Sequence, residues 1–388
     1  MSSNKVNICV MQRVCTTYRL PLLNKVCESM GFAKLHLLIG DDLPNSKVKS
    51  TKNISAAEFE VIWHRASFLN LGKRLLVWHR GLIKTLRRLK PEIIVCEGES
   101  HLLGYLSAIF YRRFFDPKVK LVLWTLGALP GEDSAKGIKR VVKKYLYKAP
   151  NAVITYSSYG KQRLTEYGVD EHIITPAVNI CDTQGHLSSY FAHKADRALY
   201  RKSLNVEGQF LVLYVGDIGP NKNIDTLVMI AKLLEHKGVV FKVVGDGNYL
   251  KQIADKINQL GLNNIEMVGR VTKDLHQYYI ASDVFLLPGR GGMVIGEAMC
   301  YGLPVLLHAA DGTEYDFIEN GIDGYILQDN TANSFAEKIE VLSNNKKLLS
   351  DLSSNAAEKM KSKLSMDKTA LSISTLLEKL EHQNNANI

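Results

Sequence analysis

Short apolar runs alternate with longer segments of helical periodicity in both halves of the chain. In the first half the runs lie at 6–11, 35–39, 92–96, 119–124 and 152–156. In the second half they lie at 210–215, 239–244, 264–268, 283–287 and 304–308. Continuous apolar runs are typical of strands buried on both faces of a parallel sheet. Because strands that alternate with helices form βαβ units, the pattern predicts an α/β protein with two parallel sheets.

The chain is too long for one ordinary hydrophobic core, since it has 388 residues. Residues 180–205 show no strand pattern and few apolar positions, so we place the linker between two domains there. We expect an N-terminal Rossmann-like domain at 1–190 and a C-terminal Rossmann-like domain at 191–364. Leucines at helical spacing predict a C-terminal helix within 365–388, which we expect to return to the N-terminal domain.

The composition is that of a folded globular protein, with 46% hydrophobic and 23% charged residues. No apolar run approaches the roughly 20 residues that span a bilayer, and the run at Val6–Val10 is too short for a signal peptide. We therefore expect a cytoplasmic protein. Its six cysteines are widely spaced without a Cys-x-x-Cys pair, which indicates reduced thiols and neither a zinc site nor disulfides.

Positive charge is concentrated in the first half of the chain. Residues 1–200 hold 30 lysines and arginines against 16 acidic residues, and residues 201–388 hold 19 against 23. This asymmetry indicates an anionic partner, which can be nucleic acid, a membrane surface or a phosphorylated acceptor. We find no helix-turn-helix, zinc finger or RNP pattern, so we expect no nucleic acid.

Residues 135–148 predict a basic amphipathic helix. Ile138, Val141 and Tyr145 fall on one face, and Lys139 and Lys144 on the other. An ordinary core-packed helix with a solvated lysine face fits this pattern as well. Because residues 71–90 and 111–120 are also rich in lysine and arginine, we expect peripheral association with the anionic inner membrane leaflet.

A glycine turn in the second half has the composition of a phosphate-binding loop. Gly216 and Gly219 follow an apolar run, Lys222 comes next, and a helical pattern begins at Ile224. Glycine lets the backbone approach a ligand, and the free amides of a helix start favour anions. Lys222 adds a positive charge, although a solvated loop lysine is the alternative. The nearby segment 245–247 we interpret chiefly as a tight turn.

The strongest signal lies at 287–305, which has the pattern strand, glycine loop, short helix, strand. Gly291, Gly292 and Met293 stand directly before the helix and present its unpaired amides to an anion such as a diphosphate. Glu297 follows within the helix. A carboxylate beside a nucleotide can accept hydrogen bonds from both ribose hydroxyls, and a solvated carboxylate is the alternative.

Taken together, these segments resemble the retaining glycosyltransferases of the GT-B fold, specifically family four (glycosyl transferases group 1). The matching pieces are Val215-Gly216, Lys222-Asn223, Gly245-Asp246-Gly247, Gly269-Arg270-Val271, Ala281 through Pro288, Glu297-Ala298-Met299, Gly302, Pro304-Val305 and Asn320-Gly321 with Gly324. Weaker matches at 18–21, 156–161 and 179–183 extend the resemblance to most of the chain. It implies an α/β protein with two Rossmann-like domains whose parallel sheets face a central cleft, the domain at 1–190 binding the acceptor and the domain at 191–364 binding the sugar nucleotide.

The resemblance also implies a donor site. Lys222 would contact the diphosphate, Glu297 the ribose, and the amides of 291–293 the phosphates and sugar, with the base near Val271. Gly216 and Gly219 belong to the same nucleotide-binding set. Lys222, Glu297 and Arg290 are the candidate catalytic residues. The reaction implied is hexosyl transfer with retention from a nucleotide-diphosphate sugar, with no cofactor and no metal ion.

Three positions depart from the family pattern. The first glutamate of the Glu-x7-Glu element aligns with Gly289, a common arginine aligns with Asp217, and a first-domain histidine aligns with Leu126. We expect Arg290 and the glycine amides to hold the sugar instead. Arg13, Arg19 and Arg270 are the candidates to replace the missing phosphate charge.

The acceptor side is less clearly marked. Glu97, Glu99 and His101 follow a predicted strand, at the end where open α/β sheets bind ligands. Together with Arg13 and Arg19 they are the acceptor-side candidates, with helix capping and solvation as the alternative. The basic first half leads us to expect a lipid-linked saccharide as acceptor, in the synthesis of a surface polysaccharide or glycoconjugate. The other hypotheses are a catalytically weak sugar-nucleotide-binding partner subunit and a GT-B sugar-nucleotide epimerase.

Overall fold

The chain folds into two compact units in a computed structural model that describes residues 5–43, 49–71, 74–98, 101–127 and 137–385. Unit 1 consists of Met1–Val178 together with Asp367–Ile388, and unit 2 consists of Asn179–Met366. The chain therefore passes from one unit to the other twice. The corresponding divisions in the sequence prediction lie after residues 190 and 364.

Unit 1 is built on a parallel sheet of seven strands in the order β3-β2-β1-β6-β7-β8-β9. The strands are β1 (Val6–Met11), β2 (Ala33–Gly40), β3 (Glu60–His64), β6 (Ile93–Glu97), β7 (Lys120–Thr125), β8 (Ala152–Thr155) and β9 (Ile174–Pro176). A separate antiparallel hairpin joins β4 (Ala66–Leu71) to β5 (Arg74–His79). The five predicted strands of this half are confirmed. β3, the hairpin and β9 were not predicted.

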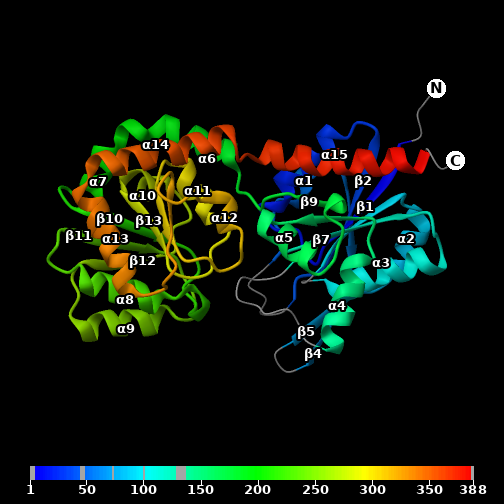
Figure 1. Cartoon of the computed structure of the whole chain (residues 1–388), viewed down its shortest axis with the longest axis horizontal. Helices are drawn as coiled ribbons and strands as arrows, with labels where there is room; N and C mark the ends of the chain where they lie inside the picture. The colour runs from blue at the N-terminus through cyan, green and yellow to red at the C-terminus, as the bar shows by residue number, and fades with distance from the viewer. Residues whose placement is uncertain (1–4, 44–48, 72–73, 99–100, 128–136, 386–388) are drawn as a thin grey trace. The chain divides into compact units, whose positions relative to one another are not determined.

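Helices cover both faces of the unit 1 sheet. They are α1 (Arg19–Ser29), α2 (Leu82–Leu89), α3 (Leu102–Phe114), α4 (Ile138–Lys148), α5 (Ser158–Glu166) and α15 (Met366–Asn385). Figure 1 shows α1 and α15 on one side of the sheet and α2, α3 and α4 on the other. The core between the sheet and α2 and α3 is made of buried side chains such as Leu86, Ile94, Tyr105 and Leu121.

Unit 2 has a six-stranded parallel sheet in the order β12-β11-β10-β13-β14-β15. The strands are β10 (Phe210–Val215), β11 (Val239–Val244), β12 (Ile265–Gly269), β13 (Val284–Leu287), β14 (Val305–Leu307) and β15 (Gly324–Ile326). The five predicted strands are again confirmed, and the buried pattern along β10 and β11 shows why. Their side chains are apolar almost throughout, as a sheet covered on both faces requires.

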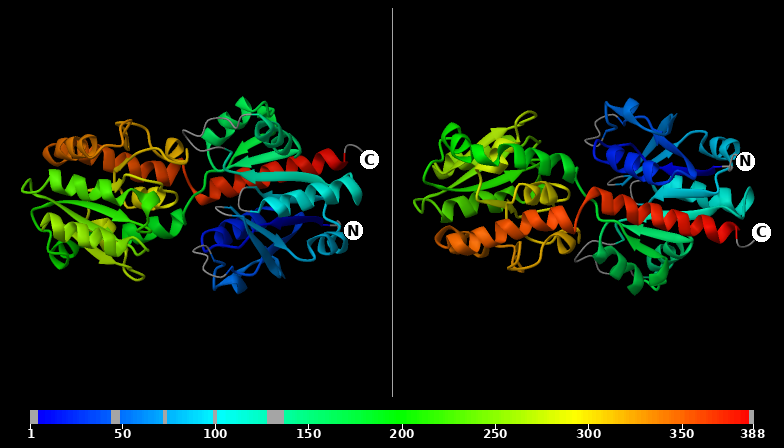
Figure 2. Two further views of the ribbon diagram at one scale, coloured as in Figure 1. Left: turned by 90° about the horizontal axis from the view of Figure 1, so that it is seen from below. Right: turned by 90° about the horizontal axis from the view of Figure 1, so that it is seen from above.

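The helices of unit 2 lie on both sides of this sheet (Figures 1 and 2). They are α6 (Thr183–His193), α7 (Arg197–Ser203), α8 (Ile224–Leu233), α9 (Leu250–Leu260), α10 (His276–Ala281), α11 (Val294–Cys300), α12 (Glu314–Phe317), α13 (Ala332–Asn344) and α14 (Lys346–Ser362). Side chains cap several of them, for example Thr331 on α13 and Asn345 on α14. Gly261 and Gly302 end α9 and α11 with positive φ angles of 66° and 69°.

The linker predicted at 180–205 is wrong, because these residues form α6 and α7 of unit 2. Polar contacts rather than an apolar stripe hold them. The side chain of Asp182 caps α6 by accepting from the Gly185 amide at 3.1 Å. Arg197 on α7 pairs with the Asp283 carboxylate at 2.6 Å. A pattern of hydrophobic positions does not report such contacts.

Each sheet reverses its strand order at one place. In unit 1 this switch point lies between β1 and β6, and in unit 2 it lies between β10 and β13. Open α/β sheets bind ligands at such a point, outside the carboxyl ends of the strands. The loops that follow these four strands are therefore the places to look for a site.

Two further sequence expectations concern the cysteines and the membrane. All six cysteines are free thiols, and all but Cys27 are buried. Among the helices that the structure describes, none carries a stretch long and apolar enough to cross a bilayer.

Candidate active site

The loops after β10 and β11 touch backbone to backbone. The Ile218 amide donates to the Asp246 carbonyl at 2.9 Å, and the Tyr249 amide donates to the Ile218 carbonyl at 3.1 Å. A Cβ atom on Gly245 would lie 1.8 Å from the Gly216 carbonyl oxygen, and one on Gly247 would lie 2.2 Å from that of Ile218. These glycines are required by close packing, in keeping with their interpretation as a turn.

Lys222 and Arg290 come together across the switch point of unit 2. The Lys222 ammonium donates to the Arg290 carbonyl oxygen at 2.6 Å. The Arg290 amide donates to the Asn221 carbonyl at 3.3 Å, so the loops after β10 and β13 are joined in both directions. Lys222 is half-buried at the end of the short turn that precedes α8. Its positive charge is thus fixed beside the glycine loop.

Gly289 stands at the position where the family pattern has a glutamate. A Cβ atom at this position would lie 2.4 Å from the carbonyl carbon of Lys222 and 2.5 Å from its oxygen. Because backbone atoms cannot give way as a flexible side chain can, no larger residue fits without separating the two loops. The close packing of the Lys222 backbone against position 289 therefore requires glycine there instead of the family's glutamate.

The glycine loop leads directly into α11. Gly292 has a φ angle of 116°, which favours glycine, and nothing lies within 4 Å of the position that its Cβ would take. Gly291 packs against Leu287, whose Cδ2 would lie 2.4 Å from an added Cβ. The first helical amides follow at Met293 and Val294, where a helix presents donors without an internal partner. Open space thus adjoins a helix start.

Glu297 is held by a buried tyrosine. The Tyr279 hydroxyl donates to the Glu297 carboxylate at 3.2 Å, and the Tyr279 ring stacks on Tyr301 at 4.9 Å. Burial raises the pKa of Tyr279 well above its ordinary value, and the nearby Glu297 charge adds to this. Tyr279 therefore remains a neutral donor, and it orients the half-buried carboxylate through one of its two oxygens.

The other residues predicted for the sugar-donor site lie at the same edge of the sheet. Val271 follows Gly269 at the carboxyl end of β12, and the Gly269 carbonyl accepts from the Gly245 amide at 2.9 Å. Gly219 lies between β10 and Lys222, packed against the Asp217 side chain. The donor candidates thus follow the carboxyl ends of β12, β10 and β13 or lie on α11.

In unit 1, Arg13 and Glu97 meet at the other switch point. Arg13 follows β1 and Glu97 ends β6, and the Arg13 amide donates to the Glu97 carboxylate at 3.1 Å. This is the position that the sequence predicted for acceptor-side residues. Glu99 lies outside the described residues.

Arg19 is buried rather than open to solvent. Its guanidinium lies 4.2 Å from the centre of the Trp124 ring and donates to the Tyr156 hydroxyl at 3.2 Å. Only 4% of its surface is exposed. Such a cation over an aromatic face is stabilising when water is excluded. Arg19 therefore fastens α1 to β7.

His101 belongs to a buried group of three histidines. Its ring lies 4.1 Å from that of His79, which in turn stacks on His64 at 6.1 Å. Burial lowers the pKa of His101 to about 3, helped by His79 and Arg13. Burial also lowers the pKa of His79 to about 4, helped by His64. At neutral pH both rings are uncharged.

Two positioning residues were not predicted from the sequence. Tyr279 is one, and Glu314 is the other. The fully buried Glu314 carboxylate accepts from the amides of Ala310 at 3.0 Å and Gly312 at 2.8 Å, which orders the loop after β14. Burial raises the Glu314 pKa, and the Asp311 charge adds to this. Tyr279 contacts a residue in another helix, and Glu314 contacts amides of an irregular loop. Neither contact follows from a periodic pattern in the sequence.

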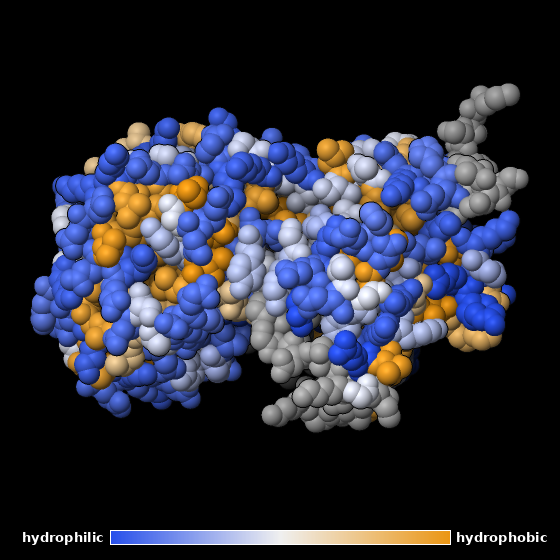
Figure 3. Space-filling model, in the orientation of Figure 1, coloured by the Kyte–Doolittle hydropathy of each residue, from blue (hydrophilic) through white to orange (hydrophobic). Residues whose placement is uncertain are grey.

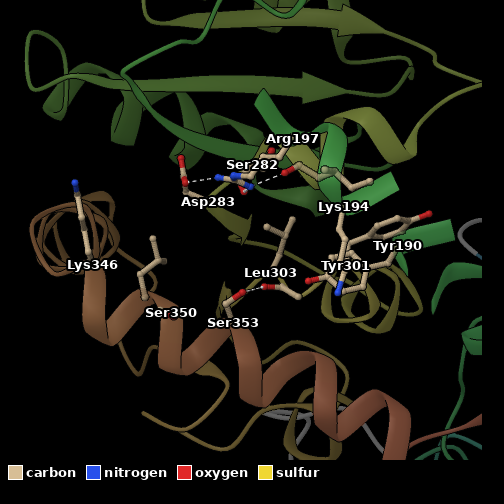
Figure 4. A pocket seen from close by; sticks show the side chains of 13 residues that line it. Tyr190, Lys194, Arg197, Ser282, Asp283, Tyr301, Leu303, Lys346, Ser350 and Ser353 are labelled. Carbon is tan, nitrogen blue, oxygen red and sulfur yellow. Dashed lines mark hydrogen bonds and ion pairs between the residues drawn. The ribbon is translucent and has the colours of Figure 1, made fainter. Parts of the chain in front are cut away.

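A cavity of about 280 Å³ in unit 2 lies away from these loops. Figure 4 shows its labelled side chains, among them Arg197, Asp283 and Ser353. Asp283 and Leu303 precede β13 and β14, so the cavity is at the amino ends of these strands. It is therefore at the opposite end of these strands from the predicted donor site. Among the described residues there is no group of His, Cys, Asp or Glu side chains suited to a metal ion.

Comparison with known proteins shows the fold and a match to a family of glycosyltransferases over part of the chain. Residues 196–359 match the protein family described as glycosyl transferases group 1. An uncharacterized glycosyltransferase of Methanocaldococcus jannaschii is 26% identical over 350 residues, which are 85% of this chain and 92% of that protein.

Other likenesses agree with this assignment. The poly(ribitol-phosphate) alpha-N-acetylglucosaminyltransferase of Staphylococcus aureus is 30% identical over 40% of this chain and 33% of its own length. The HepE protein of Anabaena, solved in complex with UDP, superposes with a TM-score of 0.74 at 17% identity, over 97% of this chain and all of that one. This last likeness concerns the fold. The chain is therefore a glycosyltransferase of the GT-B fold, and its residues 196–359 match glycosyl transferases group 1.

Proposed function

We propose that this glycosyltransferase moves a hexosyl group, with retention, from a nucleotide-diphosphate sugar to a lipid-linked saccharide during the synthesis of a surface polysaccharide or glycoconjugate. The observation that carries the donor site is the junction of Lys222 and Arg290 beside the open space at Gly292 and α11. It joins a fixed positive charge to a helix start, the combination that suits a diphosphate. Complexes of HepE with UDP and with UDP-glucose support a uridine nucleotide as the first donor to test.

Each residue of the proposed donor site has a chemical task. Lys222 and the first amides of α11 stabilise the negative charge that develops on the leaving diphosphate. Glu297, oriented by Tyr279, accepts hydrogen bonds from the ribose hydroxyls. Arg290 and the amides of 291–293 hold the sugar in place of the missing carboxylate at Gly289. Catalysis then rests on alignment and charge stabilisation, without a metal ion.

The polysaccharide context comes from relatives. Besides the Staphylococcus aureus enzyme that acts on poly(ribitol phosphate), a capsular polysaccharide glycosyltransferase of the same organism is 29% identical over 43% of this chain. Both names concern surface polymers. They support a saccharide acceptor of that class for this chain.

The surface of unit 1 supports a membrane-bound acceptor. On α4 the apolar residues Val141 and Tyr145 are 68% and 66% exposed, beside exposed Arg140 and Lys144. These two residues do not pack in the core, whereas Leu146 of the same helix packs against it. Figure 3 shows hydrophobic and strongly hydrophilic atoms side by side along the edge of unit 1 that carries α3 and α4. Such a surface suits an anionic leaflet, and we propose peripheral binding to the inner face of the membrane.

The proposed reaction is tested in two steps. UDP-, GDP- and ADP-sugars are screened for stabilisation against heat, since a ligand that binds the folded state raises the melting temperature. The sugar that stabilises is then offered to lipid-linked saccharides, and NMR compares the anomeric configuration of product and donor. A product of inverted configuration excludes the retaining mechanism. Stabilisation without turnover on any acceptor favours the partner-subunit hypothesis, and a changed donor sugar favours the epimerase.

A further inference from the structure

An apolar pocket of about 260 Å³ lies between α3 and α4 of unit 1. Its lining comes from the ends of β6 and β7 and from both helices: Gly98, Leu102, Tyr105, Leu123, Thr125, Lys143, Leu146 and Tyr147. Gly98 directly follows β6 and Thr125 ends β7, so the pocket is at the carboxyl edge of the sheet. Open α/β sheets bind ligands at this edge, and Glu97, whose carboxylate accepts from the Arg13 amide, directly precedes Gly98.

The hydroxyl groups in the lining are already engaged with the protein. The Tyr105 hydroxyl donates to the Leu146 carbonyl at 2.6 Å, and the Tyr147 hydroxyl donates to the Gly127 carbonyl at 2.8 Å. The Thr125 hydroxyl accepts from the Gly127 amide at 3.1 Å. A sugar ring enclosed here would lose its hydrogen bonds to water without replacing them, at a cost of roughly 1–3 kcal/mol per group. The lining therefore selects an apolar ligand.

The pocket continues into an exposed apolar stripe on α3. Leu102, which lines the pocket, is followed at intervals of four by Leu106, Phe110 and Phe114, and all four are exposed. Residues four apart lie on one face of a helix, so these side chains form a row that leads away from the pocket. The row is long and narrow, which matches an extended chain better than a compact molecule.

Positive charge accompanies this apolar row. Lys143 is the charged member of the pocket lining, and Arg113 lies over the Phe114 ring at 5.7 Å. Next to Phe114, Phe115 is covered by the Arg87 guanidinium at 4.9 Å. An occupant that satisfies both features has a hydrocarbon chain and an anionic group. A lipid phosphate or diphosphate has this chemistry.

We infer that the pocket between α3 and α4 binds the first part of the hydrocarbon chain of a lipid-phosphate-linked acceptor. This inference rests on the proposed function, because it gives the lipid of the acceptor its own site. A volume of about 260 Å³ is near the lower end of ligand pockets, which begin at about 300 Å³. The pocket therefore holds a segment of the chain, and the stripe on α3 carries the rest.

The binding test uses farnesyl diphosphate as a soluble probe, with excess UDP present to occupy the donor site. Calorimetry should show affinity at least about tenfold higher for farnesyl diphosphate than for inorganic diphosphate, since two buried methylene groups suffice for this factor. Equal affinity for the two compounds overturns the inference. Equal competition by dihexanoylphosphatidylcholine also overturns it, because the pocket would then accept any lipid chain.

Variants locate the binding in the pocket. Leu102→Trp fills it and should lower the affinity for farnesyl diphosphate about tenfold or more. Leu371→Trp, at an exposed leucine of α15 that lies outside both the lining and the row on α3, is the matched control and should leave the affinity within about twofold. Lys143→Gln should weaken the binding of farnesyl diphosphate but not of farnesol. If Leu102→Trp binds like the parent, the inference is wrong.

A second variant guards against a folding defect in the first. Gly98→Ala adds a methyl group 3.2 Å from Leu123 Cδ1 and 3.4 Å from Thr125 Cβ, which narrows the pocket from its sheet side. Gly98→Ala should lower the affinity for farnesyl diphosphate, while the melting temperature and the stabilisation by nucleotide sugar remain unchanged. Unchanged probe affinity in this correctly folded variant also counts against the pocket.

Glycosyl transfer separates the two proposals. Equal transfer by the parent and by Leu102→Trp to a lipid-linked saccharide, at the rate seen with the same saccharide without its lipid, overturns the pocket while the transferase activity stands. Farnesyl diphosphate binding that depends on Leu102, without transfer to any lipid-linked saccharide, sustains the pocket and overturns the proposed acceptor.

Discussion

At the scale of single residues, the proposed donor site depends on two charged side chains. Lys222→Ala and Glu297→Ala should each weaken nucleotide binding by about 1.5–3 kcal/mol, the usual worth of a charge-assisted hydrogen bond. Both side chains are half-buried, so the fold should survive. Calorimetric titration with UDP measures the loss. Lys251→Ala on the exposed side of α9 is the control, and unchanged affinity in both site variants would remove this donor site.

Tyr279 should act through Glu297 rather than on the nucleotide. Tyr279→Phe keeps the ring that stacks on Tyr301 but removes the donor to the carboxylate. We expect a smaller loss of UDP affinity than in Glu297→Ala, and no additional loss when both changes are combined. A double-mutant cycle measures this coupling. Additive losses would mean that Tyr279 contributes independently of Glu297.

Gly289 gives a prediction opposite to the family pattern. Gly289→Glu restores the missing carboxylate, yet its Cβ would lie 2.4 Å from the Lys222 carbonyl carbon. We expect a loss of about 1–3 kcal/mol in the free energy of unfolding, as for other overpacked sites, and weaker UDP binding. Gly289→Ala should show much of the same loss, because the clash begins at Cβ. Tighter binding by Gly289→Glu would show that the loops can separate without cost.

Sequence reasoning could reach some of these residues but not their contacts. Lys222, Arg290 and Glu297 stand in glycine loops or beside a helix start, and those local patterns are readable. The contact between Lys222 and Arg290 joins positions far apart in the chain, and only the packed sheet brings them together. His64 and His79 gather around His101 for the same reason. Contacts between positions far apart in the chain produce no periodic pattern in the sequence.

At the scale of elements, α4 is expected to contribute to membrane binding through its exposed cations. Arg140, Lys144 and Lys148 are exposed, and each cation near an anionic surface contributes about 1 kcal/mol. Changing all three to Gln should therefore cost about 3 kcal/mol of attraction to anionic vesicles. Sedimentation at low salt measures it. These three residues leave Lys143 and the pocket intact.

The control for charge alone is on the other unit. Lys346, Lys347 and Lys361 of α14 are exposed, and their replacement by Gln changes the net charge equally. It should leave vesicle binding nearly unchanged. Salt should weaken the parent's binding, because exposed charges are screened within about 10 Å at 0.1 M. If both triple variants sediment with vesicles like the parent, α4 is only a solvated face.

The sequence predicts the strands correctly where every residue of the strand is buried. Every strand predicted from an apolar run is present, because a parallel strand covered on both faces must be apolar throughout. β3 escaped because it pairs on one side only and is largely half-exposed, and β9 and β15 have three residues each. The β4–β5 hairpin exposes Phe68 and Trp78. Its apolar residues therefore show neither the continuous run of a buried strand nor the spacing of a helix.

At the scale of the whole molecule, acid should destabilise the fold through unit 1. The folded pKa values of His79 and His101, about 4 and 3, are below the ordinary value of 6.5. Below pH 6.5 the unfolded chain therefore binds protons that the folded chain does not. Stability is complete above this pH and falls as pH decreases, by up to about 1.4 kcal/mol per pH unit for each ring.

Urea unfolding between about pH 7.5 and pH 5 measures this loss. His101→Leu removes one buried titrating group and should make the dependence on pH shallower. His172→Leu, outside the cluster, is the comparison and should retain the parent's slope. The same slope in all three proteins would assign the acid sensitivity to other groups.

The double passage of the chain between its units has a consequence for the order of synthesis. Unit 2 is one continuous segment, whereas unit 1 closes only with α15, whose Thr369 and Leu377 are buried and whose Asp367 pairs with Lys25 at 2.6 Å. A ribosome therefore delivers the first sheet long before the helix that covers one of its faces (Figure 2). Unit 2 can complete its fold before α15 reaches unit 1. A premature stop codon just before Met366 would release a finished unit 2 joined to an exposed, chaperone-dependent unit 1.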